Sequence, residues 1–242
     1  MKKQYYIFII LLVSVFSGFV RKEDNITQGD NYFVKMKYRE ALYFYQQDLE
    51  SYEAQWKICR TYIVIADTSS GTLKRNYIRH AETAARKAIL LNDTCGAAHT
   101  WLAAALGNKA IFEGSKEKIR LCNSIKAELN RAIQLNPNDD VAYSILGTFY
   151  RQLGSITWVE RQLAETFLGS IPSGGYVDSE KKLKTAITLS PTTIRHHYEI
   201  GLLYKVWGKK ELAKSSFIKA QSLTAQVYSD YTRKKHIEEL LK

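Results

Sequence analysis

One helical pattern recurs along the chain. Four pairs of an alanine and a leucine three residues later are directly followed by Asn, Ser or Thr, and they begin at Ala88, Ala132, Ala186 and Ala220. The two side chains of such a pair lie on the same face of a helix. Proline follows the second and third pairs, directly after Asn136 and Ser190, and the residue before a proline is forced out of the helical region. Each pair therefore predicts the end of a helix that packs through small side chains.

The spacing of the four alanines indicates a repeat. They are 44, 54 and 34 residues apart, and about 34 residues is the period of tetratricopeptide repeats, which are helical pairs. The longer intervals fit the same period with insertions of 10 and 20 residues. The last unit resembles this repeat without a gap, because it carries the expected apolar, small and aromatic residues at Ile200, Gly201, Tyr204, Ala213, Phe217 and Ala220.

We therefore predict an all-α fold, a tetratricopeptide-type solenoid of helical hairpins that forms a right-handed superhelix with an inserted helix. The repeat domain is expected to span residues 22–227, and a closing helix at 228–242 to cap the stack. The expected helical pairs, about five, are 22–52, 53–95, 96–139, 140–193 and 194–227. The alternative is a compact bundle of unrelated helices, which would not produce shared spacings.

The two insertions have helical patterns of their own. Residues 155–168 contain apolar side chains at steps of three and four, at Ile156, Val159, Leu163 and Phe167. This spacing predicts an extra amphipathic helix between the two helices of the fourth unit. The segment 109–125 is expected to extend the two helices that lie on either side of Gly114.

The amino terminus has the layout of a secretory signal. Lys2 and Lys3 precede an apolar run, and small residues follow at Ser17 and Gly18, so residues 1–17 are expected to be a signal peptide. Only sixteen residues, 5–20, separate the polar start from the next charged residues, whereas a membrane-spanning helix needs about 20. An uncleaved anchor is the alternative.

Composition and charge narrow the class of function. With 13 Gly and 3 Pro in 242 residues, the chain is poor in turn residues, which argues against a β-sandwich. The net charge is +11, and residues 180–242 hold 13 basic and 6 acidic side chains. This excess of positive charge creates an electrostatic field that favours acidic partners or anionic surfaces. The alternative is that the charged residues only form well-solvated helix faces.

The sequence lacks the motifs of catalysis. It has no metal-binding histidine pair, glycine-rich phosphate loop or nucleophile motif, so we expect no enzyme activity, no metal and no cofactor. The aromatic residues fall at repeat positions that bury them, and nucleic acid is not expected as a partner. Three cysteines, Cys59, Cys95 and Cys122, allow at most one disulfide, and the pattern favours three small buried side chains on helices instead.

Five short stretches resemble a known family more closely than the repeat alone does. They comprise residues 98–103 and 124–137, followed by Leu146-Gly147, Thr157-Trp158-Val159-Glu160 and Ser170-Ile171-Pro172. These stretches resemble the tetratricopeptide domain of the regulator of microtubule dynamics family, including its inserted helix, over residues 80–228. The resemblance implies a helical-repeat adaptor, and animal members are associated with microtubules and organelle membranes.

The repeat register also predicts which side chains point into the concave groove. These candidate ligand-binding residues are Ser144, Thr148, Arg151 and Gln152 in the fourth unit, and Arg195, Tyr198, Leu202 and Lys205 in the fifth. Among them Arg151, Arg195 and Lys205 are suited to pairing with carboxylates or a chain terminus. The alternative is that these residues only keep the groove soluble.

The function predicted from these features is that of a non-enzymatic adaptor or scaffold. It would be exported to the periplasm or secreted, and it would bind a protein or peptide segment, with acidic segments favoured. The alternative is a membrane tether, in which residues 5–20 stay as an anchor and the basic carboxyl-terminal face contacts anionic lipid or an acidic protein. The oligomeric state is left open.

If residues 1–17 are a signal peptide, mass spectrometry of the protein isolated from its own cells should find Gly18 at the amino terminus. The small residues at the end of the apolar run would be the site of cleavage. An intact Met1 would instead support the tether, since the apolar segment would then remain on the chain.

Overall fold

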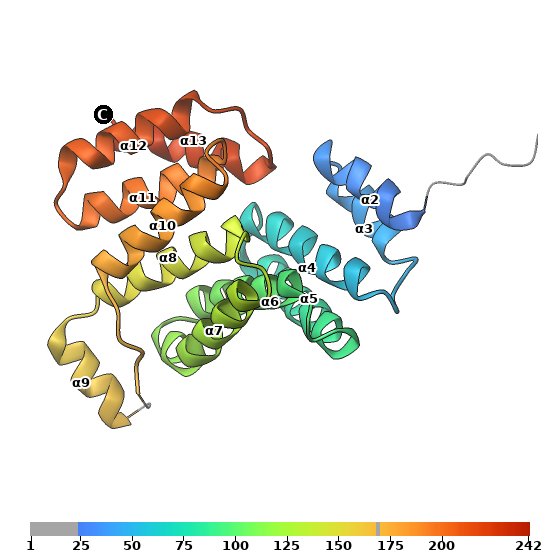
Figure 1. The fold of residues 1–242 in the computed structure, drawn as a ribbon, viewed down its shortest axis with the longest axis horizontal. Helices are drawn as coiled ribbons and strands as arrows, with labels where there is room; N and C mark the ends of the chain where they lie inside the picture. Colours follow the sequence, from blue (N-terminus) through green and yellow to red (C-terminus); the bar gives the residue numbers. More distant parts are fainter. Residues whose placement is uncertain (1–23, 168–169) are drawn as a thin grey trace, which may run out of the picture.

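The computed structural model describes residues 24–167 and 170–242, and in these ranges it consists of helices joined by short connections, with no strand (Figure 1). The helices are α2 (Asn25–Val34), α3 (Tyr38–Tyr45), α4 (Tyr52–Asp67), α5 (Gly71–Leu91), α6 (Gly96–Glu113), α7 (Ser115–Leu135), α8 (Asp140–Gly154), α9 (Trp158–Phe167), α10 (Tyr176–Leu189), α11 (Ile194–Val206), α12 (Lys210–Ser222) and α13 (Tyr228–Leu240). The predicted signal peptide at 1–17 lies outside the described residues.

Ten of these helices form five hairpins that stack in chain order. The pairs are α2 with α3, α4 with α5, α6 with α7, α8 with α10, and α11 with α12. Neighbouring hairpins contact each other through α4 and α6, α6 and α8, and α8 and α11. Figure 1 shows the hairpins following a curved path from α2 to α12. The predicted all-α solenoid of helical hairpins is confirmed.

Three hairpins contain a close helix crossing at a glycine. A Cβ atom at Gly147 of α8 would lie 2.5 Å from Cγ of Leu183 on α10, and one at Gly201 of α11 would lie 2.5 Å from Cε1 of Phe217 on α12. Gly29 of α2 approaches the Tyr45 ring of α3 in the same way, at 2.3 Å. Real Cβ atoms do not come this close to another atom. The packed partner therefore occupies the space that any larger residue would need.

Polar contacts at helix starts connect neighbouring hairpins. Asp139 precedes α8 and accepts a hydrogen bond from the Ala142 amide at 2.9 Å, which satisfies an otherwise unpaired donor of the first turn. Its other carboxylate oxygen accepts from Thr100 of α6 at 2.6 Å. The next residue, Asp140, contacts Nε2 of His196 on α11 at 2.7 Å. The start of α8 is thus fixed to both neighbouring hairpins.

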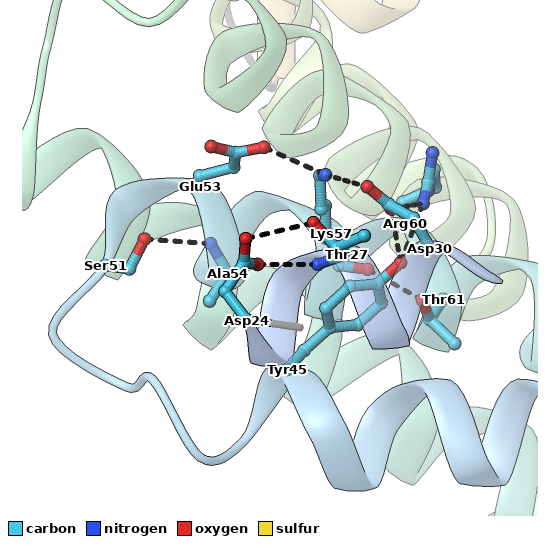
Figure 2. Close-up of polar contacts among 10 residues, drawn as sticks. All are labelled: Asp24, Thr27, Asp30, Tyr45, Ser51, Glu53, Ala54, Lys57, Arg60 and Thr61. Carbon is cyan, nitrogen blue, oxygen red and sulfur yellow. Dashed lines mark hydrogen bonds and ion pairs between the residues drawn. The ribbon is translucent and has the colours of Figure 1, made fainter. Parts of the chain in front are cut away.

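A network of charged residues fastens the first hairpin to α4 (Figure 2). Lys57 of α4 is buried and pairs with Asp30 of α2 and with Glu53, the latter at 2.9 Å. Asp30 also accepts a hydrogen bond from the Tyr45 hydroxyl at 2.7 Å, and Arg60 donates to that hydroxyl at 3.2 Å. Partial burial acts to raise the pKa of Asp30, but hydrogen bonds from Lys57 and Tyr45 outweigh it and leave the pKa below its ordinary value.

Helix α9 lies between α8 and α10 in the chain and contacts the stack through a small apolar cluster. Ala164 is buried in a small cluster with Leu153 and Ile171, and Ile156 packs beside it. Val159 was predicted on the packing face but is 57% exposed. It lies five residues before Ala164, about 140° around the helix, and therefore points away from the cluster. The side chains at 163 and 167 lie outside the part that the structure describes.

Helix α13 packs against α11 and α12 and also reaches the start of the stack. Ile237 is fully buried in the core of the last hairpin. The Tyr228 amide donates to the hydroxyl of Tyr38 on α3 at 2.9 Å, and Arg233 lies 3.7 Å from Asp67 of α4. The closing helix therefore does more than cover the end of the last hairpin, because it bridges the last hairpin and the first two.

The cysteines are free thiols in the structure. Cys59 and Cys122 are buried and Cys95 is half-buried at the start of α6, so none of the three forms a disulfide. Burial raises the pKa of the Cys59 thiol and keeps it protonated. Within residues 24–167 and 170–242, no helix combines the length and apolar character needed to cross a membrane.

The crossing at Gly147 makes a prediction about stability. Gly147→Ala should lower the free energy of unfolding by about 1–3 kcal/mol, because the new methyl group overlaps Leu183. Gly107→Ala in α6 is the matched control, since a Cβ there meets no atom within 4 Å, and it should raise stability by up to about 1 kcal/mol through helix propensity. Urea denaturation measures both, and equal stabilisation by the two changes would contradict the crossing.

The network around Asp30 makes a prediction about pH. A carboxyl group whose pKa is lowered on folding stabilises the fold above its unfolded-state pKa of about 3.9 and loses this effect as the pH falls through the folded-state value. The unfolding free energy of the Asp30→Asn protein should therefore fall less steeply between about pH 6 and pH 3 than that of the parent protein. Asp93→Asn, at an exposed carboxylate, is the control and should leave the parent slope unchanged.

Candidate functional site

The inner side of the curved stack contains a half-open cavity of about 780 Å³. Its walls come from α4, α6, α7, α8, α9, α11 and α13, so every hairpin except the first contributes to it. This volume lies within the range of about 300–1,000 Å³ that is usual for ligand-binding pockets. We therefore treat the cavity as the candidate site.

Most of the cavity wall is apolar. Helix α6 turns its small residues Ala104, Gly107 and Ala110 toward the space, which leaves room that larger side chains would fill. The bulkier apolar lining residues are Ile63, Ile111, Ile119, Ile125, Ile145, Phe149, Leu153, Ile156 and Ile171. A wall of this kind favours apolar groups of a ligand, because their contact with water is removed on binding.

Charged residues from three helices meet at another part of the wall. Arg195 and Glu199 belong to α11, Arg233 to α13 and Asp67 to α4. Glu199 accepts a hydrogen bond from Arg151 of α8 at 2.8 Å, and both side chains are only 13% exposed. Burial acts to raise the pKa of Glu199, but the charges of Arg151 and Arg195 outweigh it and leave the pKa low, so the carboxylate is ionised.

Arg195 differs from the other arginines of this cluster. Arg151 is paired with Glu199, and Arg233 is paired with Asp230 at 2.9 Å and lies near Asp67. Arg195 makes no hydrogen bond or ion pair with any residue that the structure describes. Burial and the nearby Arg233 charge lower the pKa of Arg195, yet an arginine stays charged at neutral pH. The cavity thus contains a cation without a bonded anion.

The structure separates the eight predicted groove residues into two groups. Thr148, Gln152 and Arg195 line the cavity. The other five do not belong to its lining; they are Ser144, Arg151, Tyr198, Leu202 and Lys205.

The reasons for the second group are physical. Ser144 is fully buried, and Arg151 is a partner of Glu199 rather than a free cation. Tyr198 and Leu202 pack in the last hairpin core with residues of α13, and the Tyr198 hydroxyl lies 2.8 Å from Nδ1 of His236. Lys205 is exposed. As a ligand-binding set, the eight residues remain a prediction.

Several lining residues were not found from the sequence. Arg233 belongs to α13, which lies outside the repeat and therefore has no register position. Lys118 and Ser115 belong to α7, the second helix of its hairpin, whereas the register argument used first helices only. Glu199 also lines the cavity, and its partner Arg151 is 48 residues away in the chain, so no local pattern indicates the pair.

The histidines have structural roles. Nε2 of His99 bonds to the Asp93 carbonyl and Nε2 of His197 to the Pro191 carbonyl, both at 2.8 Å and both six residues earlier in the chain. These equal contacts close the turn before α6 and the turn before α11. Within the described ranges, no three residues among His, Cys, Asp and Glu are grouped so that they could hold a metal ion.

The chain is similar to a set of mammalian proteins. The sequence profile described as Regulator of microtubule dynamics protein 1-3 matches residues 20–242. Regulator of microtubule dynamics protein 2 of Rattus norvegicus is 33% identical over 125 residues, which are 51% of this chain and 30% of that protein. Regulator of microtubule dynamics protein 1 of Mus musculus is 25% identical over 228 residues, 92% of this chain and 74% of that protein. The chain thus spans only part of the length of these relatives.

Solved structures with the same fold are tetratricopeptide proteins. A thermophilic TPR protein of Thermus thermophilus superposes with a TM-score of 0.63 at 18% identity, over 90% of this chain and 97% of that chain. A chain of the APC/C hetero-tetramer Cut9-Hcn1 superposes with a TM-score of 0.58 at 15% identity, over 88% of this chain and 36% of that chain.

The family resemblance predicted from the sequence is confirmed, because the profile match covers the inserted helix and almost all of the chain. The chain belongs to the regulator of microtubule dynamics protein 1-3 family.

Proposed function

We propose that this protein is a non-enzymatic adaptor that binds a peptide or an extended protein segment in the cavity lined by α4, α6, α7, α8, α9, α11 and α13. The observation that carries the proposal is the cavity itself, with about 780 Å³ of space and a mostly apolar wall. The apolar side chains of this half-open space face water, and a ligand that covers them removes that contact and adds packing contacts.

Polar side chains along the wall favour a peptide as the ligand. Gln152, Ser115 and Lys118 line the cavity, and their side chains make no hydrogen bond within the described residues. A peptide carries an amide donor and a carbonyl acceptor at nearly every residue, and both need partners when they leave water. The free polar groups of the wall supply such partners between its apolar stretches.

Export is a part of the proposal that rests on residues 1–17 alone, which lie outside the described residues. An exported adaptor does not meet tubulin, so the proposal does not extend the microtubule role in the names of the mammalian relatives to this chain. The exposed lysines of the last two hairpin helices and α13 support the membrane tether as the second candidate function. They are Lys205, Lys210, Lys214, Lys219 and Lys235.

Filling the cavity should block peptide binding without unfolding the protein. Gly107 lines the cavity, and a side chain built on it meets no atom within 4 Å, so Gly107→Phe should place its ring in the cavity and keep the helix intact. We expect at least a tenfold loss of affinity, about 1.4 kcal/mol, for peptides selected against the full chain from a random display library. Fluorescence anisotropy of the labelled peptides measures this loss.

Gly107→Ala is the matched control, because it also replaces the glycine by a residue of higher helix propensity but adds only a methyl group to the space. Its affinity for the selected peptides should equal that of the parent protein, and thermal unfolding should show that both variants are folded. Peptides that bind the Gly107→Phe protein as tightly as the parent would place the binding site elsewhere and would overturn the proposal.

A further inference from the structure

We propose that Arg195 binds a carboxylate group of the peptide, so that the partner segment carries a carboxylate next to apolar residues. This inference rests on the proposed function and specifies the partner of the same site. Its basis is the unequal pairing of three arginines, of which Arg195 and Arg233 line the charged part of the cavity wall and Arg151 lies behind it.

The hydrogen-bond donors of Arg195 are available to a ligand. A guanidinium group has five N–H donors, and none of those on Arg195 has an acceptor among the described residues. Arg195 lines the cavity, whereas Arg151 is engaged by Glu199 behind the wall. Arg195 is half-buried, and a charged donor group that loses its remaining water to a ligand needs an acceptor in exchange. A carboxylate that enters the cavity with the ligand supplies this acceptor.

The positive charge around Arg195 is partly offset by its neighbours. Glu199 and Asp67 line the same part of the wall and carry negative charge, and both act on Arg195 electrostatically. A ligand group with one negative charge is therefore sufficient to pair with Arg195. A carboxylate also matches the planar fork of a guanidinium, because its two oxygens accept two parallel hydrogen bonds.

Apolar residues of the partner would lie beside its carboxylate. Ile63 is one helical turn before Asp67 on α4 and faces the same cavity, and Ile145 occupies the α8 part of the wall. The carboxylate has two sources in a peptide, the chain terminus and an acidic side chain. Both present the same group to Arg195, so the experiment has to distinguish them.

The test uses seven-residue peptides with free carboxyl termini, selected against the full chain from a random display library and labelled with fluorescein at the amino terminus. Each peptide is made with a terminal acid or a terminal amide, and with its Asp and Glu residues kept or replaced by Asn and Gln. Loss of affinity with the terminal amide would identify the chain terminus as the ligand group, and loss with the side-chain amides would identify an acidic residue.

Changing Arg195→Gln should weaken binding of the carboxylate peptides at least about tenfold. The same change should have no effect on the peptide that lacks the critical carboxylate. Lys205→Gln is the matched control, because Lys205 is on the same helix but exposed and outside the cavity lining, and it should bind like the parent. Thermal unfolding should show that the Arg195→Gln protein is folded at the temperature of the binding assay, a check that is needed because the charge of Arg195 also acts on Glu199.

The outcomes separate this inference from the proposed function. Gly107→Phe can block binding of the peptides while neither Arg195→Gln nor the neutralisation of every carboxylate changes their affinity. This outcome would overturn the role of Arg195 but not the adaptor proposal. If none of the peptides binds in a way that Gly107→Phe prevents, the adaptor proposal is overturned as well. The fatty acid dodecanoate is tested as well. If it binds and no peptide does, the ligand is an amphiphile, and both the peptide adaptor and the role of Arg195 are overturned.

Discussion

The fold depends on how closely the two helices of a hairpin approach each other. At Gly29, Gly147 and Gly201 the first helix has no room for a side chain, because an aromatic or leucine side chain of the second helix occupies the space. Close approach lets the paired helices bury most of their facing surface, which a single hairpin needs before it can stack on the next. The regular crossing keeps successive first helices on the same side of the stack.

The cavity is a consequence of that arrangement. Because α4, α6, α8 and α11 all turn one face inward, the inner surface is assembled from four hairpins and its shape follows their side chains. The small residues of α6 make it deep at the centre, and charged residues of α11, α4 and α13 meet at another part of its wall. A surface built from several repeats can combine apolar and ionic groups that no single helix carries together.

The sequence was informative wherever the repeat itself determines the structure. Alanine spacing and the Ile200 to Ala220 pattern led to the hairpins. Register predicts which face a side chain occupies but not what it meets there. It could not reveal that Arg151 pairs with Glu199, a contact between two hairpins. Arg233 was missed because α13 follows no repeat.

Helix α13 changes the mechanics of the stack. An open solenoid behaves like a spring whose pitch can vary, because distant repeats do not touch. Here the contacts of Tyr228 with Tyr38 and of Arg233 with Asp67 tie the last turn of the coil to the first. Stretching the coil would require these contacts to break. A distortion of any one hairpin therefore has to be accommodated by the other hairpins, because the contacts of α13 hold the two ends of the stack together.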